Sequence, residues 1–195
     1  SNSIAVVVET DGRQGKAVAL RDCEGRYCHS RKALTVGKSF QTIDGKRKEG
    51  VINPRQTDVI SDENRLIFTA EIPYGEQCAF GFTDGAGLTQ RLIDKYRQTE
   101  YVHGKNGGLF ARKEMLSEVE RHPGSYVPSL AELAQFYYRR QLGEVTNCEL
   151  MQGEYLTVSE SSDKTFYLID MENGIVTGTL SKQYAGLRLR LFYLF

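Results

Sequence analysis

Cysteine and histidine side chains are the first candidates for chemistry in this sequence, because thiolates and imidazoles bind metals and act as nucleophiles or bases. The 195-residue chain has three histidines and four cysteines. The cysteines are Cys23, Cys28, Cys78 and Cys148. No two of them have the C-x-x-C spacing of a zinc site. Cys28 directly precedes His29, but adjacency in sequence does not orient a base onto a thiolate. We therefore expect no bound metal, no cofactor and no cysteine-based catalysis.

Cys23 and Cys28 are close enough in sequence to allow two interpretations. A glycine between them permits a tight loop, which a disulfide could close in an oxidising compartment. Alternatively both are thiols in the core, because an unpaired cysteine behaves as a small apolar side chain. The sequence leaves both interpretations open.

The charge composition argues against two classes of partner. Lys plus Arg and Asp plus Glu each number 25, so no net charge attracts nucleic acid or an anionic membrane. No run approaches the roughly 20 apolar residues that a transmembrane helix needs. The first residues lack the pattern of a signal peptide, and Ser1 and Asn2 are typical of a cloning remnant, so we expect a native signal or lipoprotein segment to precede them.

Strand signals begin at the N-terminus. Residues 4–10 and 16–20 are rich in β-branched and apolar side chains, and the Asp-Gly pair between them favours a hairpin turn. A second Asp-Gly pair, at residues 44–45, predicts another hairpin with the charged residues 46–49 at or near its tip. Residues 66–72 form a further apolar run that predicts a strand.

Apolar residues recur at helical spacing in three later segments. This period predicts helices over residues 87–98, 111–121 and 130–141. The last helix has the clearest start, because Ser129 is placed as its N-cap and Glu132, three residues later, completes a capping box. We expect Ser129 and Glu132 to begin a helix and to do no chemistry.

Strand signals dominate the C-terminal part of the chain. Residues 155–159, 165–170 and 175–180 are predicted strands, and the Asn-Gly pair at 173–174 predicts a two-residue hairpin turn. Residues 187–191 alternate apolar and basic side chains, which predicts a strand with one face on the core. The uncharged apolar residues after them predict a buried C-terminal segment.

The order of these motifs resembles a bacterial, Bacteroidetes-type family of C-type-lectin-like domains of unknown function, which is related to the Fibrobacter succinogenes major paralogous domain. The matching segments are residues 11–22, 83–89, 127–133, 155–162, 166–176 and 188–190. They place about residues 1–30 and 80–195 within the family pattern and leave about 31–79 as a β-rich insertion. This chain has no tryptophan, so Tyr126 and Leu156 stand at two of the family's aromatic positions.

The resemblance implies an α+β fold and a single C-type-lectin-like domain over residues 1–195. In such a domain the N- and C-terminal strands pair, two to three helices flank the sheet, and a loop-rich half carries the variable function. Calcium is not expected, because the sequence lacks the Glu-Pro-Asn and Trp-Asn-Asp signatures of calcium-binding lectins.

The function that the resemblance implies is a non-catalytic ligand-binding or adhesion module, extracellular or at a bacterial cell surface, with a glycan or a protein as its ligand. The alternative is a structural subunit of a surface appendage, joined through its terminal strands. The same superfold includes the formylglycine-generating oxidases, but the four cysteines here form no matching copper-binding pair, so we expect no enzyme activity. The oligomeric state is left open.

The resemblance also suggests where a ligand would bind. The loop of residues 159–163 is expected to meet the region of Tyr184. Ser159, Glu160 and Asp163 could then hydrogen-bond sugar hydroxyls, and the ring of Tyr184 could stack on a sugar or contact a protein. The alternative is that Ser159 and Glu160 bind turn amides and that Tyr184 packs on the sheet.

Overall fold

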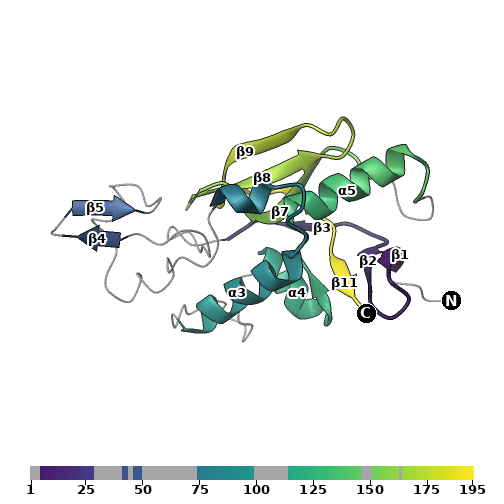
Figure 1. Ribbon diagram of the computed structural model, residues 1–195, viewed down its shortest axis with the longest axis horizontal. Coiled ribbons are helices and arrows are strands. Elements are labelled where there is room, and N and C mark those ends of the chain that lie inside the picture. Colours follow the sequence, from purple (N-terminus) through teal and green to yellow (C-terminus); the bar gives the residue numbers. More distant parts are fainter. Residues whose placement is uncertain are drawn as a thin grey trace.

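The computed structural model describes residues 5–28, 41–43, 46–49, 74–98, 114–145, 151–162 and 164–195. Within these residues it contains three α-helices and three β-sheets, which have four, five and two strands (Figure 1). The fold is therefore α+β, as expected from the sequence. Its assignment as C-type-lectin-like stays a prediction.

The predicted N-terminal hairpin is present. Strands β1 (Ala5–Thr10) and β2 (Gly15–Ala19) pair antiparallel. In the turn, the Asp11 carboxylate accepts a hydrogen bond of 2.8 Å from the backbone N–H of Gln14. Gly12 has a φ of 90°, which glycine adopts without the steric penalty of a Cβ. The Asp-Gly pair thus sets the turn, as the sequence predicts.

The strands near the two ends of the chain lie side by side. Strand β11 (Phe192–Leu194) pairs antiparallel with β2, and Phe192 lies opposite Val18. Its other edge pairs with the short strand β6 (Ser125–Tyr126), which gives the sheet order β1-β2-β11-β6. Figure 1 shows β11 next to the N-terminal hairpin. The expected pairing of N- and C-terminal strands is confirmed.

The five-stranded sheet contains most of the C-terminal strands. Its members, in spatial order, are β3 (Cys23–Gly25), β10 (Leu187–Leu189), β7 (Glu154–Glu160), β8 (Thr165–Asp170) and β9 (Val176–Ser181). Only β10 and β7 pair in parallel among these described strands. The predicted hairpin between β8 and β9 is present, but its turn is longer than the two residues predicted. The Asp170 N–H donates to the Ile175 carbonyl at 2.8 Å, and the Gly174 N–H donates to the Asp170 carbonyl at 2.7 Å.

The three α-helices follow the predicted apolar spacing. They are α3 (Gly85–Gln98), α4 (Met115–Arg121) and α5 (Leu130–Gln141). The 3-10 helix η2 (Tyr74–Cys78) was not predicted. The capping box of α5 is confirmed, since the Ser129 N–H donates to Glu132 Oε2 at 2.8 Å and the Glu132 N–H donates to Ser129 Oγ at 3.2 Å. No helix within the described ranges is long and apolar enough to span a bilayer.

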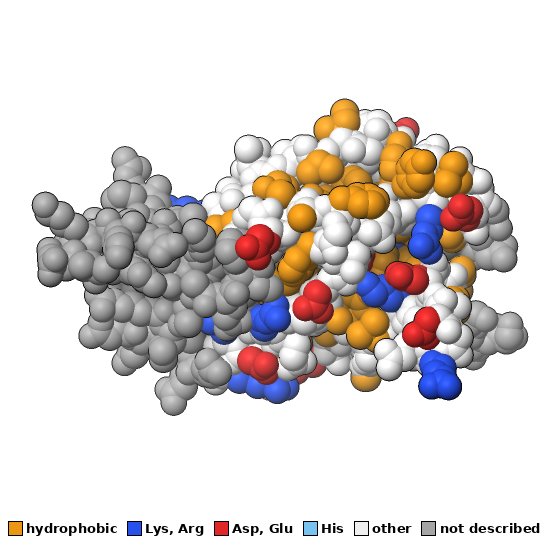
Figure 2. Space-filling view, in the orientation of Figure 1, with side chains coloured by type: hydrophobic (Ala, Val, Ile, Leu, Met, Phe, Trp, Pro, Cys, Tyr) orange, Lys and Arg blue, Asp and Glu red, His pale blue; other side chains and the backbone are white. Residues whose placement is uncertain are grey.

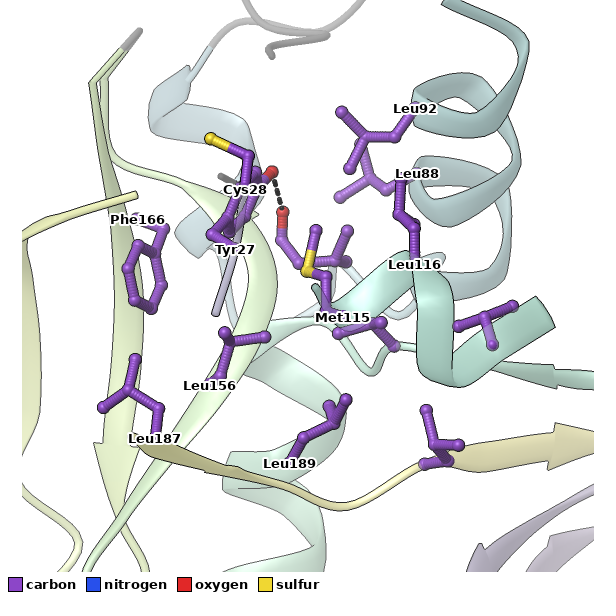
Figure 3. Close-up of a cluster of buried hydrophobic side chains, with 14 of the residues drawn as sticks. Tyr27, Cys28, Leu88, Leu92, Met115, Leu116, Leu156, Phe166, Leu187 and Leu189 are labelled. Carbon is purple, nitrogen blue, oxygen red and sulfur yellow. Dashed lines mark hydrogen bonds between the residues drawn. The ribbon is translucent and has the colours of Figure 1, made fainter. Parts of the chain in front are cut away.

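The larger hydrophobic cluster lies between helices α3 and α4 and the five-stranded sheet. Figure 3 shows Leu88 and Leu92 of α3 and Leu116 of α4 converging with Leu156 of β7 and Leu189 of β10. All five side chains are at most 1% exposed. Burial of one such side chain contributes about 1.5–3 kcal/mol, so this contact holds the two helices against the sheet.

A second hydrophobic cluster lies under helix α5. Phe136 of α5 meets Phe192 of β11 edge to face, with ring centroids 6.2 Å apart. Val18 of β2 and Ile169 of β8 belong to the same cluster. Helix α5 therefore packs across both larger sheets and joins them.

The charged segment predicted as a hairpin tip is a strand instead. Strand β5 (Lys46–Glu49) pairs antiparallel with β4 (Gln41–Ile43), so the turn between them is shorter than predicted. The predicted strand at 66–72 and most of the insertion at 31–79 lie outside the described residues.

Candidate functional site

Ser159, one of the residues predicted to contact a ligand, lies in the interior near the end of β7. Its side chain is fully buried. Its hydroxyl accepts a 2.9 Å hydrogen bond from the backbone N–H of Leu130, in the first turn of α5. The first backbone amides of a helix have no hydrogen-bond acceptor within that helix. Ser159 supplies the acceptor for one of them, so its hydroxyl is used inside the protein.

Glu160 is also buried, in an ion pair. Its Oε1 lies 2.7 Å from the Lys182 ammonium nitrogen, and neither side chain is exposed. Gln77 of η2 completes the arrangement, donating to Glu160 Oε2 at 3.2 Å and accepting from the Glu160 N–H at 2.7 Å. The Lys182 ammonium also lies 4.9 Å from the centre of the Tyr27 ring. These contacts hold η2 and the β9–β10 connection to β7.

The remaining residues predicted for this site do not join them in the structure. Tyr184 is 52% exposed, in the turn after β9, whereas Ser159 and Glu160 are inside. Asp163 lies outside the described residues. Ser159 and Glu160 therefore do not share a surface with Tyr184, because their polar groups make hydrogen bonds and an ion pair inside the protein. A ligand contact at Asp163 or Tyr184 stays a prediction.

Cys23 and Cys28 are thiols in the structure, so the disulfide considered for them is not formed. The chain between them runs through β3 and a bridge at Arg26. Extended backbone rises about 3.3 Å per residue, which carries the two Cα atoms beyond the roughly 7 Å limit for a disulfide. Cys28 lies in the larger hydrophobic cluster. Among the described residues, Cys23 instead joins Glu118 and His122 in a group that could hold a metal ion.

A second charge pair, in which only the arginine is fully buried, was not predicted from the sequence. Arg190 is fully buried, although the alternating pattern places it on the solvent face of its strand. Its Nε donates to Asp22 Oδ1 at 2.5 Å, and its terminal nitrogen donates to the Leu20 carbonyl at 2.9 Å. The Tyr155 hydroxyl donates to the other Asp22 oxygen at 2.6 Å. Burial, followed by this hydrogen bond, raises the pKa of Tyr155 to about 12.

Glu132 has a tertiary role beyond its capping box. Its Oε1 accepts from Lys16 Nζ at 2.6 Å and from the Tyr126 hydroxyl at 2.9 Å. Burial first, and then the Glu132 charge, raise the pKa of Tyr126 well above its usual range. One carboxylate therefore connects α5 to strands β2 and β6.

The predicted burial of the C-terminal segment is wrong for its last residues. Leu194 and Phe195 are each 54% exposed, and Val7 on the edge strand β1 is 53% exposed. The backbone of Phe195 still pairs with Gly15, through hydrogen bonds of 2.9 and 3.1 Å. Beside it lies a groove of about 600 Å³ that is lined by residues 9–11, 14–16, 194 and 195. We call β1, this groove and the two exposed C-terminal side chains the terminal-strand surface.

Apolar side chains are also exposed elsewhere. On the face in Figure 2 they gather over the part of the molecule that carries β8, β9 and α5. Among the described residues, the large apolar side chains that are exposed away from the terminal-strand surface are Phe80, Tyr138, Leu142, Ile175, Val176 and Tyr184. Val176 begins β9, which is an edge strand of the five-stranded sheet. Within the described part of the chain, β1 and β9 are thus edge strands that each carry an exposed valine.

Comparisons with known proteins place few constraints on this chain. No family model matches it, and no curated protein matches it. A solved structure, a fimbrial protein from Bacteroides ovatus ATCC 8483, aligns with 92% of this chain at 15% identity and a TM-score of 0.48. The chain spans 35% of that protein's chain. A TM-score of this size does not establish a shared fold, so the fimbrial description stays with that protein.

Proposed function

We propose that this protein is a non-catalytic structural module that joins a second copy of the same chain along the outer edge of β1. The observation that carries the proposal is an open, β-branched edge strand beside exposed apolar side chains on the terminal-strand surface. An extracellular or cell-surface setting in a bacterium belongs to the proposal and rests on the sequence resemblance.

The edge of β1 supports the proposal through its backbone. In the described part of the chain, β2 is the strand that pairs with β1, and β1 stands first in its sheet. An edge strand offers unpaired N–H and C=O groups to another strand. Its register shifts between Val7 and Glu9, and Arg139 donates to the Val8 carbonyl, so the regular part of the edge is Ala5 to Val7.

The side chains of β1 suit pairing with an identical strand. In an antiparallel pair centred on Val6, the two Val6 residues would face each other and Ala5 would face Val7 of the other copy, which uses only the regular part of the edge. Like charges that lie opposite each other destabilise a strand pair. This arrangement places no like charges opposite each other. Covering Val7, Leu194 and Phe195 would contribute on the order of 1.5–3 kcal/mol for each side chain that becomes fully buried.

The internal use of polar groups also supports a non-catalytic role. Glu160 and Arg190 are fully buried and held by ion pairs. The hydroxyl of Ser159 and the carboxylate of Glu132 are engaged at the start of α5. Groups in such environments stabilise a fold, since they are neither accessible to a substrate nor free to change partners.

Sedimentation velocity over a series of protein concentrations tests the proposal. We expect wild-type protein to shift from monomer to dimer, and Val7→Lys to raise the dissociation constant at least tenfold, because lysine on an edge opposes strand pairing. Val176→Lys is the matched control, because Val176 is 45% exposed on the edge strand of the other sheet. A wild-type protein that stays monomeric up to ~1 mM, or equal weakening by both variants, contradicts the proposal.

Glycan binding is the competing function, and it has a separate readout. Tyr184 is the exposed member of the predicted ligand site. Binding on a glycan array that is lost in Tyr184→Ala, in a protein that does not self-associate, would favour the glycan alternative.

A further inference from the structure

We propose that Cys23, Glu118 and His122 form a binding site for a zinc-class divalent cation. Their potential ligand atoms all lie within 4.8 Å of one another. Three atoms at such separations always have a common point within about 2.8 Å of each, and zinc ligands lie about 2.0–2.3 Å from the ion. Side-chain adjustments of less than about 1 Å would therefore close the site, well within rotamer freedom.

The three residues come together through the packing of α4 against β3. Glu118 and His122 are four positions apart, so they lie on the same face at the end of α4. The chain after β3 meets the start of this helix, where the Met115 N–H donates to the Arg26 carbonyl at 2.8 Å and Arg26 bridges to Glu114. This attachment sets the position of Cys23 relative to the helix.

The hydrogen bonding of His122 prepares it to act as a ligand. Its Nδ1 lies 2.8 Å from the Glu118 carbonyl oxygen. A carbonyl only accepts, so Nδ1 carries the proton in this bond, and in the neutral ring that tautomer leaves the lone pair on Nε2 for a metal ion. Metal-binding histidines usually make such a bond with their second ring nitrogen, because it orients the ring.

The donor set selects the class of ion. A thiolate, an imidazole and a carboxylate suit zinc and its first-row neighbours, whereas calcium and magnesium prefer oxygen ligands alone. Glu118 also holds an ion pair with Arg121 Nη1 at 2.8 Å. The Arg121 side chain is half exposed, so it can turn toward solvent when an ion takes its place beside the Glu118 carboxylate.

The site opens to solvent on one side. Cys23 and His122 line a groove of about 640 Å³ that also includes Pro123 and Tyr193. His122 is exposed, Cys23 is half-buried and Glu118 is buried. Three protein ligands leave a position for water or for a donor group from a partner molecule. An ion bound there would tie β3 to the end of α4 and would stabilise the folded state by mass action.

Metal titration of the purified, chelator-treated protein tests this inference, with Zn²⁺ and Co²⁺ as the probes. We expect one ion to bind per chain by calorimetry, and Co²⁺ to give a thiolate-to-cobalt charge-transfer band in the near ultraviolet. Cys23→Ser should remove that band. His122→Gln should weaken Zn²⁺ binding by at least ~100-fold, since even the partners that orient a ligand change affinity about 10–100-fold.

The control for thiol binding is Cys78→Ser, because Cys78 is an exposed thiol in η2. We expect this variant to bind one ion with unchanged affinity and to keep the charge-transfer band. His122 is exposed at a helix end, so His122→Gln should fold normally, which far-ultraviolet circular dichroism checks. Absence of 1:1 binding by the wild type, or unchanged affinity in both Cys23→Ser and His122→Gln, would overturn the inference.

Discussion

Replacing Lys182 with methionine removes one charge from the buried Glu160–Lys182 pair and keeps most of the side-chain length. Both side chains are inaccessible to solvent, and their charged atoms are 2.7 Å apart. In the variant, the Glu160 carboxylate would stay in the interior with Gln77 beside it, at 3.2 Å. The buried carboxylate would then lack the ammonium group that lies 2.7 Å away in the wild type.

The expected loss of stability follows from the loss of one member of this buried pair. Removal of one member of a buried ion pair costs about 3–5 kcal/mol. For a chain of this length, 1 kcal/mol corresponds to about 2–4 °C in melting temperature, so Lys182→Met should melt roughly 10 °C below the wild type. The double variant Glu160→Gln with Lys182→Met removes both charges of the pair, and it should recover at least half of the loss.

Urea unfolding, followed by circular dichroism, measures these free energies. The chain has no tryptophan and 11 tyrosines, so tyrosine fluorescence provides the second probe. Lys164→Met is the control, because the Lys164 carbonyl accepts from the Lys182 N–H while its own side chain is partly exposed. A loss below about 1 kcal/mol for Lys182→Met, in the range of an exposed pair, would refute the reasoning, as would a double variant less stable than the single one.

Two other features give separate predictions. Gly174→Ala should destabilise the protein by at least about 1–2 kcal/mol, because Gly174 has a φ of 76° and an added Cβ would lie 2.8 Å from the Tyr137 ring; an unchanged melting temperature would contradict this strain. Folding raises the pKa of Tyr155 from 10.0 to about 12, so its stabilising contribution is complete below pH 10 and is lost as the pH rises toward 12. Urea denaturation at a series of pH values should therefore show that the free energy of unfolding falls more steeply with pH in the wild type than in Tyr155→Phe. The same pH dependence in both proteins would contradict a contribution from Tyr155.

The elements that the sequence predicts well depend on residues close together in the chain. The Asp-Gly and Asn-Gly hairpins need turn residues at adjacent positions, and Gly12 and Gly174 both adopt positive φ. The capping box needs only Ser129 and Glu132, three positions apart. Local backbone geometry determines these features, so they can be recognised without knowledge of the fold.

The burial of Glu160 could not be predicted from the sequence, because burial of a polar side chain depends on distant partners. Lys182 and Gln77 bind Glu160 inside the protein, and the segment around Glu160 does not specify that arrangement. Strand alternation places Arg190 toward solvent, yet its side chain is fully buried and pairs with Asp22, which is far away in the chain. The alternation of apolar and polar residues distinguishes the two faces of a strand, but it does not show which other elements cover each face.

The sequence by itself determined the α+β class, the main turns, the start of α5 and the pairing of the terminal strands expected from the resemblance. Only the tertiary structure decided which charges are internal, that Leu194 and Phe195 are exposed, and that Cys23 lies beside Glu118 and His122. The physical reason is the separation in sequence between the interacting residues, because turns and helix caps depend on a few neighbouring residues. Burial and side-chain convergence depend on how separate elements pack against each other.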